Sequence, residues 1–237
     1  MESWIEYSGK AGTGADIGPA KLRKVLEKFN LLSSYVPGVQ ANFMFGADGD
    51  AGEDPITLTK EFIHQTPKVW PTINIPTPYG GTPLYDQLHR ANRLLQEMPF
   101  LFYYNPYLAI TIKNYDPATF YDHLIDLNLA RASAAMLFRR FMTSAPRMIR
   151  FLNGLRVLST QVELRELRRI RATLKSDAQF RAYHEGRSRS LPVFYKHLFE
   201  RRLGRYAELL PPSARQPILE PPAPKLSAAT PARATIA

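Results

Sequence analysis

The 237-residue chain contains no cysteine. This absence excludes disulfide bonds, thiolate metal sites and cysteine-ligated iron–sulfur clusters within the chain itself. Its five histidines do not pair at metal-ligand spacing, which argues against a zinc site. Long apolar runs are also missing, since no window approaches the roughly 20 apolar residues that a membrane-spanning helix needs.

The first residues, "MESWIEYSGKAG", lack the apolar core of a signal peptide and carry Glu2 and Glu6. With neither a predicted leader nor a predicted membrane span, we expect a cytoplasmic protein.

Acidic side chains are scarce in the second part of the chain. Residues 1–130 carry 10 Lys and Arg against 14 Asp and Glu, a net charge of −4, whereas residues 131–237 carry 21 against 7, a net charge of +14. A basic half is compatible with binding to nucleic acid or to an anionic membrane surface. The simpler interpretation, which we favour here, is a set of amphipathic helices with solvated arginines.

Apolar spacing and the positions of proline and glycine divide the first part of the chain into alternating elements. They predict helices over 19–33, 54–65 and 82–96 and buried strands over 38–46 and 68–75. Helices that alternate with strands at this spacing are typical of parallel strands joined by helical crossovers. The sequence therefore predicts an α/β fold in which the loops after the two strands meet at one end of the sheet.

The rest of the chain is predicted to be mainly helical. We expect one further strand around 107–113, helices over 117–143, 146–175 and 190–209, and a disordered Pro/Ala-rich tail over 211–237. The expected domain organisation is an α/β region over 1–115 followed by a helical region over 116–210.

The stretch "VQANFMFGADGDAG" (39–52) is a predicted strand that runs into a loop with three glycines and two aspartates. Glycines let the backbone turn tightly and approach a ligand, and Asn42 can hydrogen-bond hydroxyl groups. Alternatively, the glycines only shape a turn and Asp48 and Asp50 are solvated turn residues. A second loop, within "NIPTPYGGTPLYDQL", is either a pocket wall or a stiff connection between a strand and a helix.

Three motifs, in order, resemble the second half of a radical SAM enzyme, most closely the large group whose members often carry a cobalamin-binding domain. They are "ES" near the start, "FGADGDAGE" after the first predicted strand, and "PTPYGGTPLY" after the second. The resemblance covers residues 1–115. It implies a partial parallel (βα) barrel, part of a TIM-like barrel, that binds S-adenosylmethionine at the carboxyl ends of its strands.

The resemblance also implies particular contacts with the cofactor. Glu2 and Ser3 would approach its methionine part, Lys10 its carboxylate, and Asn42 its ribose hydroxyls. The segments Gly46, Ala47, Asp48 and Pro76, Thr77, Pro78 would flank its adenine and ribose.

The chain departs from this family at the most important motif. Radical SAM chemistry needs a Cys-x3-Cys-x2-Cys motif that holds a [4Fe–4S] cluster, and the chain has neither these cysteines nor the strands that bear them. We therefore assign no catalytic or metal-binding residue and expect the chain to be inactive alone. The cluster half would come from another polypeptide or lie outside this gene model, which would make the chain a fragment. The alternative is a non-catalytic scaffold or regulator with a basic helical surface.

Overall fold

The computed structural model describes residues 18–211. The expected contacts at Glu2, Ser3 and Lys10, and nearly all of the predicted disordered tail, lie outside this range. The elements follow one another along the chain in this order: α1 (Gly18–Tyr35), β1 (Val39–Met44), α2 (Asp54–Gln65), β2 (Val69–Asn74), α3 (Pro83–Arg90), the 3₁₀ helix η1 (Phe100–Phe102), α4 (Pro117–Ala132), α5 (Ala134–Phe141), α6 (Arg147–Ser176), α7 (Ala178–His184), α8 (Val193–Leu203) and the 3₁₀ helix η2 (Gly204–Leu209).

The predicted mixed α/β character is confirmed, with helices far outnumbering strands in the described chain. The first two helices and both strands of the first part form where they were expected. The helix expected over 82–96 ends at Arg90, because Asn92 and Glu97 adopt positive φ angles of 53° and 58° that a right-handed helix cannot include. The strand expected around 107–113 does not form, and only an isolated antiparallel bridge joins Leu94 to Ile110.

The helix expected over 117–143 is divided in two by Ser133. This residue has extended backbone angles (φ −66°, ψ 151°), and its side chain caps α5 by accepting a hydrogen bond from the Met136 N–H. The helix expected over 146–175 is confirmed as α6, whereas the region expected as one helix over 190–209 consists of α8 and η2.

The two strands pair in parallel, with Val39 opposite Val69 and Met44 opposite Asn74. Helix α2 makes the crossover between them, as a parallel pair requires. These are the only strands within residues 18–211, so the observed sheet is smaller than a half barrel.

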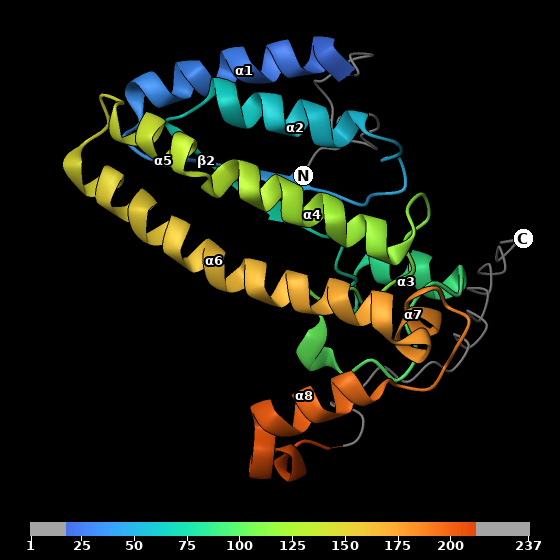
Figure 1. The fold of residues 1–237 in the computed structure, drawn as a ribbon. Helices are drawn as coiled ribbons and strands as arrows, with labels where there is room; N and C mark the ends of the chain where they lie inside the picture. Colours follow the sequence, from blue (N-terminus) through green and yellow to red (C-terminus); the bar gives the residue numbers. More distant parts are fainter. Residues whose placement is uncertain (1–17, 212–237) are drawn as a thin grey trace, which may run out of the picture.

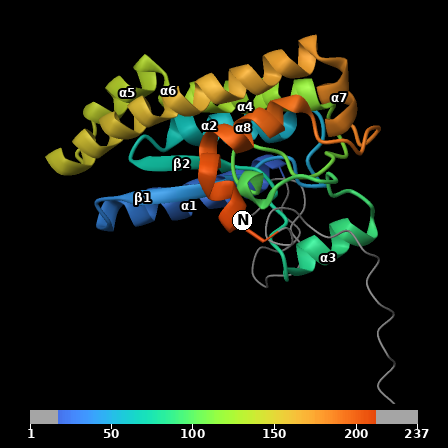
Figure 2. The same ribbon diagram turned by 90° about the horizontal axis from the view of Figure 1, so that it is seen from below.

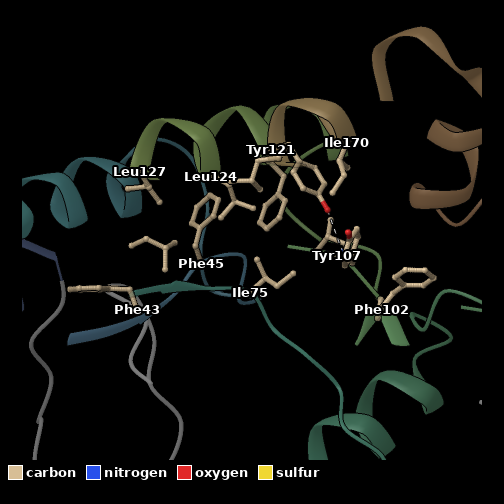
Figure 3. Close-up of a cluster of buried hydrophobic side chains, with 14 of the residues drawn as sticks. Phe43, Phe45, Ile75, Phe102, Tyr107, Tyr121, Leu124, Leu127 and Ile170 are labelled. Atoms are coloured by element: carbon tan, nitrogen blue, oxygen red, sulfur yellow. Dashed lines mark hydrogen bonds between the residues drawn. The ribbon is translucent and has the colours of Figure 1, made fainter. Parts of the chain in front are cut away.

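One face of the sheet is apolar and is covered by helices. Figures 1 and 2 show α2 and α4 along one side of the strands, with α1 beside α2 and α6 beside α4. Aromatic side chains fill the space between the layers. The ring of Phe43 meets that of Phe62 of α2 edge-on, with 4.9 Å between centroids, and the ring of Phe45 stacks on that of Phe120 of α4, with 5.1 Å between centroids. Figure 3 shows how this cluster continues through Leu124.

The same buried cluster extends from the sheet to the C-terminal helices. It includes Ile75 after β2, Tyr107, and Ile170 of α6 (Figure 3), so residues on both sides of position 115 contribute to one hydrophobic core. Tyr107 also donates a hydrogen bond to Glu166 at 2.8 Å. The aromatic segment around residues 100–107 therefore packs the sheet region against the helices.

The opposite face of the sheet is mixed: it includes Met44 and the buried Trp70, but it also carries four uncharged polar side chains. Because side chains alternate along a strand and parallel partners share a face, Gln40 and Asn42 of β1 lie on the same side as Thr72 and Asn74 of β2. The first two are exposed and the other two are half-buried. Polar side chains on buried parallel strands are unusual, since such strands are normally covered on both sides by apolar groups.

The outer edge of β2 is closed by side chains. Pro71 has no N–H to offer, its carbonyl accepts from Arg131 at 3.2 Å, and the Ile73 carbonyl accepts from Asn105 at 3.3 Å. Glu163 of α6 joins these two donors, accepting from Arg131 at 2.5 Å and from Asn105 at 2.9 Å. No strand between residues 18 and 211 pairs with the outer edge of β1.

Across residues 18–211, no helix is long and apolar enough to cross a bilayer.

Candidate functional site

The loops that follow β1 and β2 leave the sheet side by side. The Phe45 N–H donates to the Asn74 carbonyl at 2.8 Å, which continues the strand pairing to the start of both loops. The structure thus brings the two predicted cofactor-binding segments, 46–48 and 76–78, to the same end of the sheet. The carboxyl ends of parallel strands are where ligands bind in open α/β sheets.

The first loop is closed by its own aspartate. Asp50 is 1% exposed, and its Oδ2 accepts hydrogen bonds from the Gly46 N–H at 2.9 Å and from the Ala47 N–H at 3.2 Å. Asp50 is therefore not the solvated turn residue that one interpretation of the sequence expected. These two amides are engaged within the loop, so an anion would have to displace the carboxylate to use them.

Gly46 is required by packing as well as by conformation. Its φ is +92°, and an added Cβ would come within 2.5 Å of Cε2 of Phe120. The ring of Phe120 lies there because it stacks on Phe45, the residue before the glycine. The glycine thus lets the chain turn out of β1 directly over the aromatic core.

Asp48 is held by a long-range partner. Both of its carboxylate oxygens accept from the Arg93 guanidinium, at 2.8 and 2.6 Å, and Arg93 also donates to the Thr111 carbonyl at 2.9 Å. Asn114 donates to the backbone carbonyls of Asp48 and Asp50, both at 2.8 Å. Two distant segments therefore fix the loop in one conformation.

Tyr115 completes the support by donating to the Gly52 carbonyl at 2.8 Å. Burial, together with the nearby carboxylates of Asp50 and Glu53, raises the pKa of Tyr115 to about 12. Its hydroxyl is therefore neutral and remains a hydrogen-bond donor at physiological pH.

Asn42 lies on the mixed face of the sheet, opposite Thr72 in the strand register. Its Oδ1 accepts from the Gln40 amide at 2.9 Å, which directs its own amide hydrogens away from Gln40. Asn42 and Thr72 together offer amide and hydroxyl groups that can bind the hydroxyl groups of a ligand.

The second loop is stiff at its start and better suited to shape a wall than to supply charge. Pro76 and Pro78 are buried, and the half-buried Thr77 bonds to the Ile75 carbonyl at 3.3 Å. Gly81 adopts a φ of +79°, and Thr82 caps α3 by accepting from the Tyr85 N–H at 3.3 Å.

Among the described residues, no group of three or more His, Asp or Glu side chains could hold a metal ion. The mixed face of the sheet offers a neutral polar ligand the exposed amide of Asn42 and the half-buried side chains of Thr72 and Asn74.

The residues that sequence reasoning missed are Arg93, Asn114 and Tyr115, which support the first loop from outside. Their side chains act at sequence separations of 45 to 66 residues, so no local pattern indicates their role. The only local signal was Asp50, which follows Gly46 at a spacing that suits a turn closed by its own side chain.

No protein-family model, curated protein or solved structure matches this chain.

Proposed function

We propose that this chain is the C-terminal part of a radical SAM enzyme of the type that often carries a cobalamin-binding domain. In this proposal the chain supplies one wall of a site for S-adenosylmethionine within a partial (βα) barrel. The half that binds the cluster belongs to another polypeptide or lies outside this gene model. The chain would act in the cytoplasm, where conditions are reducing.

The observation that carries the proposal is the asymmetry of the two-stranded sheet. Helices cover its apolar face, while its other face presents Gln40, Asn42, Thr72 and Asn74. In a (βα) barrel the helices likewise cover the outside of the strands, and the ligand binds at the carboxyl ends of the strands. The closed edge of β2 further supports a terminal position for that strand in the sheet.

The polar side chains of the mixed face suit the cofactor's adenosyl part. Asn42 and Thr72 can hydrogen-bond ribose hydroxyls, and the loops 46–48 and 76–78 begin four residues further along the two strands. The chain does not suit the [4Fe–4S] cluster, because it has no cysteine to hold iron. The cluster, when present in the complete enzyme, supplies the electron that cleaves S-adenosylmethionine, and we derive no step of that reaction for this chain.

Calorimetric titration with S-adenosylmethionine tests the proposal. We expect weak binding that Asn42→Ala reduces about fivefold, as expected for the loss of one hydrogen bond worth about 1 kcal/mol. Asn30→Ala is the matched control, since Asn30 is equally an exposed asparagine but lies on α1. Absence of binding, or equal losses for both variants, would contradict the proposal and favour the alternative of a non-catalytic scaffold.

A second assay tests the dependence on a partner. The purified chain, supplied with iron, sulfide and a reductant under anaerobic conditions, is expected to form no 5′-deoxyadenosine. Appreciable 5′-deoxyadenosine formed by the chain alone would refute the proposal that the cluster-binding half must be supplied separately.

A further inference from the structure

The N-terminal half of α6 has an inverted pattern of burial. Its buried positions are Asn153, Val157 and Thr160, two of which are polar. The positions between them, Leu155 and Leu158, are apolar and are 46% and 66% exposed. A surface helix normally places apolar residues against the core and polar residues in water.

The exposed apolar side chains form one surface with those of α5. On α6 they recur at helical spacing and therefore share a face of that helix. The members of this surface, which we name the α5–α6 apolar face, are Phe138, Phe141, Met142, Met148, Phe151, Leu152, Leu155, Leu158 and Val162.

A groove runs along the α5–α6 apolar face. It has a volume of about 620 Å³ and is lined mainly by Leu and Phe side chains of both helices, with Arg147 and Arg150 among them. Arg150 bridges the two helices by donating to the Phe141 carbonyl at 3.2 Å. In Figures 1 and 2 the α5–α6 connection forms one end of the molecule, the end opposite to α3 and α7.

The end of α1 lies at the same end of the molecule, across a cavity that is lined largely by polar residues. This cavity of about 170 Å³ is lined jointly by residues 33–37 and by residues 144–146 of the α5–α6 connection. Tyr35 and Val36, in this segment, are 81% and 45% exposed. Three segments therefore present apolar side chains at the same end of the molecule.

The charge of this region has a single sign. Residues 133–162 contain five arginines and no aspartate or glutamate. Arg140 and Arg156 lie over the ring of Trp70, with guanidinium carbons 4.7 and 5.5 Å from its centroid. Arg139 and Arg147 are exposed, so they are available to an external anion.

We infer that the α5–α6 apolar face docks onto an anionic phospholipid bilayer, with its apolar side chains in the headgroup boundary and its arginines on the lipid phosphates. Exposed Phe, Leu and Met beside arginines are the composition that interfacial helices use for this purpose. The face matches a negatively charged partner, and a second copy fits poorly because two acid-free cationic surfaces repel each other. Nucleic acid would leave the apolar side chains without a partner.

This inference does not depend on the proposed function. It is tested by flotation of the full chain with vesicles of phosphatidylcholine, alone or mixed with phosphatidylglycerol. We expect binding to the mixed vesicles only, and we expect the partition coefficient to fall about tenfold or more in Phe151→Gln/Leu158→Gln. Val193→Gln is the control, because Val193 is 52% exposed on α8, outside the α5–α6 apolar face.

A pair of charge variants tests the electrostatic part. Arg139→Gln/Arg147→Gln is expected to weaken binding severalfold, whereas Arg165→Gln/Arg168→Gln, two exposed arginines beyond the face, should have little effect. Salt at about 1 M should weaken binding of the unmodified chain, because it shortens the Debye length to about 3 Å.

Three outcomes would overturn the inference. The first is equal binding to neutral and anionic vesicles, and the second is no binding to either. The third is a dimer, measured by sedimentation without lipid, that Phe151→Gln/Leu158→Gln dissociates; it would assign the face to a second copy. Circular dichroism of each variant establishes that the chain is folded before its vesicle binding or sedimentation is interpreted.

Discussion

Removal of the Glu163 carboxylate should destabilise the fold more than removal of any exposed acidic group. Glu163 lies against the Arg131 guanidinium, whose side chain is 5% exposed, and it also accepts from Asn105. Burial lowers the pKa of Arg131, and Glu163 opposes that shift. Even without Glu163 the guanidinium stays charged at neutral pH, because its ordinary pKa is above 12. Glu163→Ala would therefore leave a buried charge without its counterion.

Breaking a buried ion pair costs about 3–5 kcal/mol. We expect about 3 kcal/mol, near the lower limit, because the Glu163 side chain is 23% exposed and water can reach the site. Asp122→Ala is the matched control: Asp122 pairs with Arg171 at 2.6 Å, but both side chains are about 40% exposed, so a loss below about 1 kcal/mol is expected.

Urea denaturation, monitored by circular dichroism, measures both losses. An unchanged dependence of the free energy of unfolding on urea concentration would show that the denatured states are comparable. In Arg131→Met/Glu163→Leu we expect most of the stability to return, since neither charge remains buried. If Glu163→Ala costs no more than Asp122→Ala, the closure of the β2 edge by this pair contributes little and the reasoning fails.

Two further perturbations probe the loop and the C-terminal core. Gly46→Ala should lower the free energy of unfolding by about 2 kcal/mol or more, because the added Cβ would overlap Phe120. Gly52 also has a positive φ but open space around it, so Gly52→Ala should cost only about 1 kcal/mol. Equal losses for the two variants in urea denaturation would contradict this expectation. Burial lowers the pKa of His184 to about 3, below its unfolded value of about 6.5, so its contribution is complete above pH 6.5 and is lost as pH falls. Between pH 7 and pH 5 the free energy of unfolding should drop by about 2 kcal/mol more in the parent than in His184→Phe. If the free energies of unfolding of the two proteins fall in parallel with pH, the lowered pKa of His184 is refuted.

The first half of the fold was predictable because its signals are local. Each strand is a short apolar run bounded by glycine or proline, and the helices beside them have clear apolar faces. The early end of α3 was not predictable, since Asn92 and Glu97 adopt positive φ without being glycine. The break at Ser133 was missed because apolar residues continue past it, although serine is a favoured helix cap.

The candidate site was predictable only in part. The sequence placed Asn42 inside a strand and the loops 46–48 and 76–78 at one end of a parallel sheet, and the structure has them in these places. The supports of the first loop could not be read from the sequence, because Arg93 and Asn114 reach it through tertiary contacts. The cofactor assigned to this site remains a prediction.

Helix α6 has a consequence for how the molecule would sit on a surface. Its 30 residues make a rod of about 45 Å. At one end Ile149 and Leu152 line a cavity together with Gly38 and Val39 at the start of β1. At the other end Arg171 pairs with Asp122 of α4, the helix whose Phe120 stacks on Phe45 directly after β1. Because the α5–α6 apolar face runs along the side of the first half of α6, a chain docked on lipid through it would lay that half of the helix along the bilayer surface. Loops 46–48 and 76–78 belong to the other end of the rod, so the residues that dock and the residues of the candidate site lie apart.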